Sequence, residues 1–161
     1  MMRVVLVFDS TENGRTAVEV LEFLGKSGLN GDIYMLYRSN IKITLFKKES
    51  EVFTKEGVVA SKILDESKKR LENIGLKVKQ VKIIFGSVAD EISKLEKILS
   101  PHLIILGLED EGFIRRLFQK DECSKILSKT TTPVVVCRQG FEISKVPEIC
   151  ECVKCAVRNS F

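Results

Sequence analysis

Residues 3–8 read RVVLVF, and the polar pair Asp9 and Ser10 follows them directly. An unbroken run of β-branched and apolar residues is typical of a strand whose two faces are both buried. Strands of that kind belong to parallel sheets, whose faces are covered by helices. The run therefore predicts the first strand of an α/β domain.

Outward from this run, helix-like and strand-like segments alternate along the chain. Apolar residues at positions 17, 20, 21 and 24 have helical spacing, and the spacing of Asp9 and Glu12 predicts that Asp9 caps that helix. A longer helix is expected over residues 54–74, with Val59 on its buried face, after an irregular stretch at 38–53. The expected strands are residues 3–8, 33–37, 76–85, 102–107 and 134–137. This order predicts an open, parallel, five-stranded sheet with helices on both faces, of the Rossmann-like or flavodoxin-like kind.

The composition fits one soluble domain of 161 residues, with 44% apolar and 30% charged residues. No apolar run approaches the roughly 20 residues that span a bilayer, and no signal peptide is evident, so we expect a cytoplasmic protein without membrane contact. Basic and acidic residues are interspersed, with a net charge of +4. That pattern argues against a nucleic-acid partner. We expect the α/β domain at residues 1–138 and, at residues 139–161, a cysteine-rich tail with the apolar spacing of an amphipathic helix.

Ligands of open parallel sheets bind beyond the carboxyl ends of the strands. Three segments are expected to converge there: Asp9 with Ser10, Tyr37 with Arg38, and the loop after Gly107. The sequence therefore predicts that a binding site draws on these residues, without specifying the ligand.

Three stretches resemble the universal stress protein family: VVLVFDS at 4–10, GSVADEI at 86–92 and LIILGLEDEGFIRRLFQKDECSKILSKTTTPVVVCR at 103–138. The resemblance covers about residues 3–138 and implies the fold predicted above. Members of this family that bind nucleotides hold ATP with three glycines and a Ser or Thr in the segment after the fourth strand. The resemblance also implies that Asp9 matches the acid near the base or ribose of the nucleotide. Arg38 then replaces a small apolar residue beside the adenine.

Residue by residue, Gly107 matches the first glycine of that loop, whereas Asp110, Lys120 and Asp121 replace the other three motif residues. Glycine lets a backbone approach a phosphate, while Asp110 brings a side chain and a negative charge. Asp121 is expected to cap the following helix and to repel a phosphate by roughly 4 kcal/mol at a separation of about 4 Å. The ATP loop is therefore predicted to be degraded, with Lys120 as a possible phosphate contact.

Our leading hypothesis is a non-enzymatic stress-response or regulatory protein that acts through protein contacts with an unknown partner. No catalytic residue is identified, because the single histidine, His102, is expected at the edge opposite the pocket. The family resemblance implies a homodimer through the last strand, residues 133–138. One alternative is an ATP- or AMP-binding member with an acidic, Mg²⁺-assisted loop. The other is a thiol or metal sensor that uses Cys150, Cys152 and Cys155.

Overall fold

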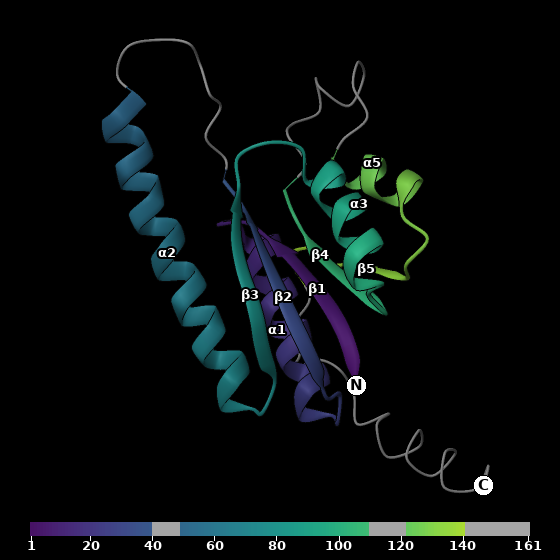
Figure 1. Cartoon of the computed structure of the whole chain (residues 1–161). Coiled ribbons are helices and arrows are strands. Elements are labelled where there is room, and N and C mark those ends of the chain that lie inside the picture. The colour runs from purple at the N-terminus through teal and green to yellow at the C-terminus, as the bar shows by residue number, and fades with distance from the viewer. Residues whose placement is uncertain (40–48, 110–121, 141–161) are drawn as a thin grey trace, which may run out of the picture.

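Five parallel strands form one sheet in the computed structural model of the chain, in the order β3-β2-β1-β4-β5 (Figure 1). The structure describes residues 1–39, 49–109 and 122–140, and of residues 49–54 the backbone alone. The strand order reverses between β1 and β4, the point at which open α/β sheets usually form a binding crevice. The strands are β1 (Met2–Phe8), β2 (Gly31–Arg38), β3 (Lys77–Ile84), β4 (Leu103–Gly107) and β5 (Val134–Val136).

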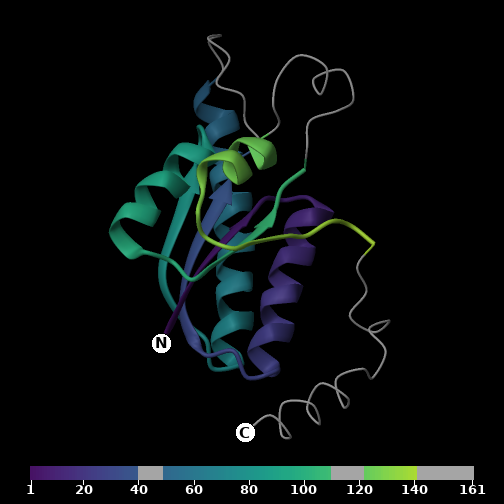
Figure 2. The same ribbon diagram turned by 90° about the vertical axis from the view of Figure 1, so that its right-hand side faces the viewer.

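Helices cover both faces of the sheet (Figures 1 and 2). Buried side chains of α1 (Glu12–Lys26) and α2 (Glu49–Asn73) share one apolar cluster with the sheet, and those of α3 (Val88–Leu99) and α5 (Glu122–Lys129) share another. The predicted α/β architecture, with a parallel five-stranded sheet between two layers of helices, is confirmed.

The first strand explains why its sequence is apolar throughout. Val4, Leu6 and Phe8 belong to the cluster under α1 and α2, whereas Val5 and Val7 belong to the cluster under α3 and α5. All five side chains are at most 1% exposed. Because successive residues of a strand point to opposite faces, a strand in the middle of the sheet needs apolar residues at every position.

Three details differ from the sequence predictions. Helix α2 begins at Glu49, so the stretch expected to be irregular ends sooner than residue 53. Thr11 is the N-cap of α1 in place of Asp9. Val59 is 47% exposed, because α2 packs through Ala60, Leu64 and Leu71, and Val59 falls beside that stripe.

The loop that leads into β5 is held by one carboxylate on α3. Glu96 Oε1 accepts hydrogen bonds from the Thr132 amide at 3.2 Å, from the Thr132 hydroxyl at 2.7 Å and from the Thr130 hydroxyl. Burial alone raises the pKa of Glu96, but these hydrogen bonds outweigh it and lower the pKa below its usual value. The start of the edge strand β5 is thereby fixed against α3.

Gly107 lies where the end of β4 meets the first turns of α1. A Cβ atom at this position would stand 2.2 Å from the Asn13 carbonyl oxygen and 2.6 Å from Ala17 Cβ. The first of these neighbours is backbone and cannot rotate away. The close approach of helix and strand therefore depends on glycine at this position.

We expect Gly107→Ala to lower the free energy of unfolding by about 2 kcal/mol, because the added methyl group must push α1 away from β4. Urea denaturation followed by circular dichroism measures this change. Gly57→Ala is the matched control, since a Cβ atom at Gly57 meets nothing within 4 Å. That substitution lies inside α2 and should be neutral or stabilising by up to about 1 kcal/mol. Equal stability of the two variants would contradict the packing role of Gly107.

Candidate functional site

A buried carboxylate lies at the centre of the site, just beyond the end of β1. Asp9 is 2% exposed, and both of its oxygens accept hydrogen bonds. Oδ1 accepts from the Thr11 amide at 3.0 Å and from the Thr11 hydroxyl. Oδ2 accepts from the Glu109 amide at 3.0 Å and from Arg38 Nη2 at 2.8 Å. Asp9 therefore joins the ends of three strands, β1, β2 and β4.

The cation in this group is Arg38, the last residue of β2. Its Nη2 also donates to the Glu109 carbonyl oxygen at 2.8 Å, so one nitrogen serves both β1 and β4. Side-chain exposure is 16% for Arg38 and 0% for Asp9. A charge-assisted pair that is this shielded from water is much stronger than a pair at the surface. The chain thus supplies its own cation to Asp9.

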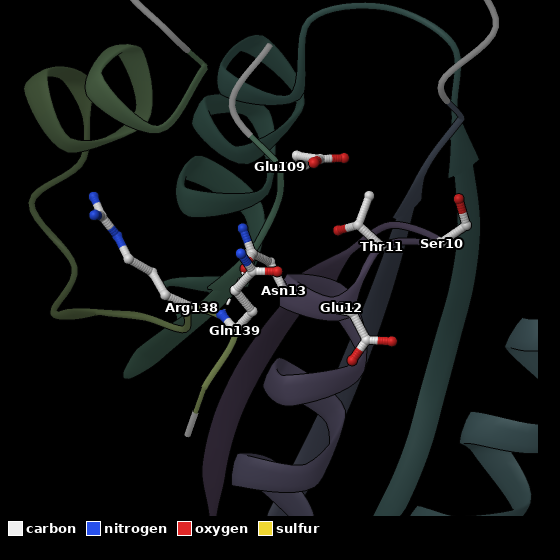
Figure 3. Close-up of a pocket in the computed structure, with 7 residues that line it drawn as sticks. All are labelled: Ser10, Thr11, Glu12, Asn13, Glu109, Arg138 and Gln139. Atoms are coloured by element: carbon white, nitrogen blue, oxygen red, sulfur yellow. Dashed lines mark hydrogen bonds between the residues drawn. The ribbon is translucent and has the colours of Figure 1, made fainter. Parts of the chain in front are cut away.

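A polar cleft of about 610 Å³ opens beside this cluster (Figure 3). Asn13, in the first turn of α1, joins two of its walls: Nδ2 donates to the Leu108 carbonyl at 3.0 Å, and Oδ1 accepts from the Gln139 amide at 2.7 Å. The carboxylates of Glu12 and Glu109 line the cleft together with one cation, Arg138. The lining residues are Ser10, Thr11, Glu12, Asn13, Glu109, Arg138 and Gln139.

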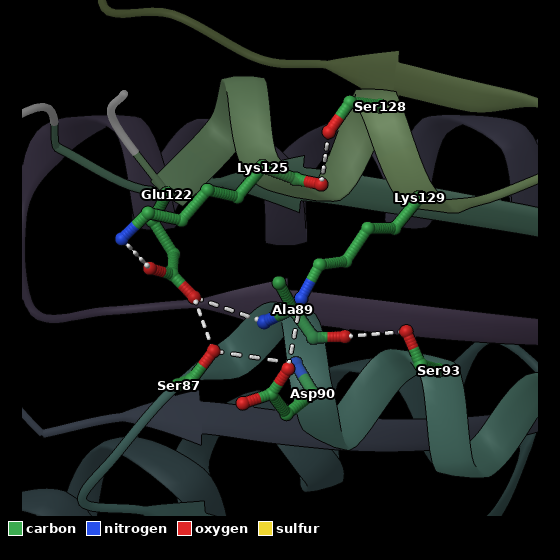
Figure 4. A network of polar contacts seen from close by, with 8 residues as sticks. All are labelled: Ser87, Ala89, Asp90, Ser93, Glu122, Lys125, Ser128 and Lys129. Atoms are coloured by element: carbon green, nitrogen blue, oxygen red, sulfur yellow. Dashed lines mark hydrogen bonds and ion pairs between the residues drawn. The ribbon is translucent and has the colours of Figure 1, made fainter. Parts of the chain in front are cut away.

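A second carboxylate occupies the N-terminus of α3 (Figure 4). Glu122, the first residue of α5, accepts through Oε1 from the Ala89 amide at 2.9 Å and from the Ser87 hydroxyl at 3.2 Å. Lys129 pairs with Asp90 at 3.0 Å and lowers the pKa of that carboxyl. Helix N-termini attract anions, and at α3 the chain provides the anion itself.

The structure brings together Asp9, Arg38 and Gly107, as their positions at strand ends predict. Ser10 lines the neighbouring cleft. Three further predicted site residues, Asp110, Lys120 and Asp121, lie outside the described residues, and their roles stay predictions.

His102 lies at the other end of the sheet, as predicted. Its Nδ1 accepts from the Arg3 amide at 3.0 Å, and its own amide donates to the Arg3 carbonyl at 2.8 Å. These contacts join the amino ends of β1 and β4. The histidine therefore has a structural role far from the site.

Several contacts of the site have no signal in the sequence. Thr11 and Glu109 donate to Asp9 through backbone amides, which every residue type except proline carries, and the Thr11 hydroxyl adds a side-chain contact. Asn13 and Glu122 act on partners more than 30 positions away in the chain. Only the general preference for polar residues at helix starts hints at the last two.

Cys123 and Cys137 are reduced and buried. Burial raises the pKa of the Cys137 thiol to about 11, so the thiol is almost entirely protonated at neutral pH and is a poor nucleophile. Within the described ranges, no group of three or more His, Cys, Asp or Glu side chains could hold a metal ion. The predicted cysteine ligands Cys150, Cys152 and Cys155 lie outside the described residues.

An open parallel sheet with a polar crevice beside the reversal of its strand order places the protein in the doubly wound α/β class. The family model for the universal stress protein family matches residues 1–138, and the chain belongs to this family. No curated protein gives a significant match. In the part of the chain that the structure describes, no helix has the length and apolar character needed to cross a membrane.

Solved structures of universal stress proteins share the fold. One from Burkholderia pseudomallei is 13% identical, with a TM-score of 0.62 over 83% of this chain and 92% of that chain. One from Archaeoglobus fulgidus in complex with dAMP is 14% identical, with a TM-score of 0.55 over 86% of this chain and 98% of that chain. One in complex with cAMP is 14% identical, with a TM-score of 0.54 over 83% of this chain and 94% of that chain.

We expect Asp9→Asn to lower the free energy of unfolding by about 3 kcal/mol. The substitution leaves the Arg38 guanidinium buried without its counter-charge. If the new amide oxygen keeps the Thr11 contacts, its NH2 group faces two donors, Arg38 Nη2 and the Glu109 amide. Chemical denaturation measures the loss.

Glu12→Gln is the control for this experiment, because the Glu12 side chain is 58% exposed and, among the described residues, forms its one ion pair with Arg15 at the surface. We expect it to change stability by less than about 0.5 kcal/mol. In the double variant Asp9→Asn with Arg38→Met, part of the stability should return, since the unpaired charge is gone. A single Asp9→Asn variant as stable as the control would contradict the central role of the pair.

Proposed function

We propose that this universal stress protein is a non-enzymatic regulator that does not hold ATP in the manner of the family's nucleotide-binding members. One observation carries the proposal: both carboxylate oxygens of Asp9 are already occupied by groups of the same chain. The carboxylate that the family resemblance assigns to nucleotide contact is therefore committed to internal partners.

The position of Arg38 supports the same proposal. Its guanidinium lies at the end of β2, against Asp9 and the Glu109 carbonyl. A base that took the place of this side chain would have to break a shielded ion pair, and the two groups would then need other partners. The carboxylates of Glu12 and Glu109 in the neighbouring cleft add repulsion toward phosphate groups.

Calorimetric titration with ATP and AMP, each with and without Mg²⁺, tests this proposal. We expect no heat that fits a dissociation constant below about 100 µM, which corresponds to roughly 5.5 kcal/mol of binding free energy. The Arg38→Val variant serves as a comparison that shows whether this side chain alone limits nucleotide access. Micromolar affinity of the unaltered protein for any of these ligands would contradict the proposal.

The runner-up is an AMP- or ATP-binding role with an acidic, Mg²⁺-assisted loop. The polar cleft at Ser10, Asn13 and Arg138 favours it, since Arg138 offers a phosphate contact. Two universal stress protein structures of this fold were solved in complex with cAMP and dAMP, respectively, and they support a small adenine nucleotide as the ligand in this reading. The same titration separates the two functions. The third hypothesis, a thiol or metal sensor, rests on the tail cysteines alone.

Protein contacts through the last strand complete the proposed function. β5 is an edge strand with no charged residue, and Val135 and Val136 are each 39% exposed. Exposed apolar edges favour pairing with another strand. We therefore infer a homodimer through residues 133–138, which forms a scaffold for an unknown protein partner in the cytoplasm.

We expect Val135→Lys to shift the protein toward monomer and to weaken dimerisation at least about tenfold, because it places like charges at the paired edge. Sedimentation equilibrium across a concentration series measures the change. Leu127→Lys adds the same charge on α5 at a residue that is 51% exposed, and it should leave the dimer intact. A monomeric unaltered protein, or a dimer indifferent to Val135→Lys, would count against β5 pairing.

A further inference from the structure

The sheet has a second edge, β3, and its chemistry differs from that of β5. β3 is eight residues long, whereas β5 has three. Among the described residues, β3 pairs only with β2, so the backbone amides and carbonyls of its outer side have no strand partner. The exposed residues of β3 are Lys77, Lys79, Gln80, Val81 and Lys82.

Neighbouring helices leave much of β3 uncovered. α2 lies along it (Figure 1), and Val78 and Ile83 are half-buried on that side. Val81 nevertheless stays 39% exposed, and Phe85, just beyond the strand, is 44% exposed. The edge therefore offers apolar side chains as well as backbone groups that pair with no described strand.

The charges of this edge are mainly positive. Lys77 forms no ion pair with a described residue, and Lys79 reaches Asp32 only at 3.9 Å. Lys82 is paired with Glu91 of α3 at 2.5 Å. Lysines on an edge strand hinder pairing with an identical strand, because like charges would face each other. A second copy of this chain is thus the wrong occupant for β3.

We propose that the β3 edge binds an extended, acidic segment of a partner protein by strand addition. Main-chain hydrogen bonds to β3 would supply affinity, as in other cases of strand addition. Carboxylates on the added strand would meet Lys77 and Lys79, and alternate apolar residues would meet Val81 and Phe85. A nucleic acid fits less well, since its phosphates could accept from the lysines and the amides but have no donor for the outward carbonyls of the edge. The proposal is independent of whether the protein binds a nucleotide.

Fluorescence anisotropy with a labelled eight-residue peptide of alternating glutamate and valine tests the proposal. We expect saturable binding, and we expect the amides of residues 77–84 to gain protection from hydrogen exchange in the complex. The same peptide with N-methyl groups on alternate amides keeps its charge but loses hydrogen bonds. It should bind at least about tenfold more weakly, because each lost hydrogen bond contributes roughly 1 kcal/mol.

A matched pair of variants tests the lysines. Lys77→Gln with Lys79→Gln should weaken peptide binding about fivefold, whereas Lys62→Gln with Lys69→Gln removes the same charge from exposed positions on α2 and should change it less than about twofold. Three outcomes would overturn the proposal: no saturable binding, equal binding of the N-methylated peptide, or tighter binding of an oligothymidylate of the same length. The last two would indicate a general cationic surface.

Discussion

The ion pair between Asp9 and Arg38 holds the carboxyl ends of β1, β2 and β4 together. Asp9 follows β1, Arg38 ends β2, and Glu109 follows β4, so one carboxylate and one guanidinium fix the relative positions of three strands. Desolvation of such a pair carries a penalty of several kcal/mol for each ion, which is offset only when both partners are present with good geometry. The crevice next to the pair takes its shape from that requirement, since Thr11 and Glu109, which line it, are held by Asp9.

On the other face of the sheet, carboxylates likewise accept hydrogen bonds from donors of the same chain. Glu122 offers its carboxylate to the N-terminus of α3, and Glu96 of α3 in turn holds the loop before β5. At the Asp9 cluster and at the N-terminus of α3, a carboxylate of this protein occupies the position where an external anion would otherwise accept hydrogen bonds. Hydrogen-bond donors and charges that could bind a ligand in an α/β protein connect segments of the same chain here.

The fold could be predicted from the sequence because its central strands, β1 and β4, are apolar in a way that only buried parallel strands require. Residues 3–8 and 103–106 contain no charged residue after Arg3, and helical spacing is clear in α1 and α3. The buried face of α2 was harder to predict, since Val59 lies beside the residues that pack against the sheet, Ala60 and Leu64. The convergence of Asp9 and Arg38 followed from strand ends, but the hydrogen bonds of Glu109 and Asn13 join residues about 70 to 130 positions apart, and no local pattern encodes them. Gly107 shows a further limit, because the pattern suggested closeness to a ligand whereas the structure shows closeness to α1.

The strand order β3-β2-β1-β4-β5 keeps the two edges of the sheet apart by four strand spacings, about 19 Å. An assembly joined at β5 would therefore carry its two β3 edges at its far ends, pointing away from each other. Such an assembly is bivalent. Its two β3 edges could bind two acidic segments at once, on one partner or on two. Bivalence raises apparent affinity through effective concentration, so even a weak contact at each edge would suffice for a stable complex.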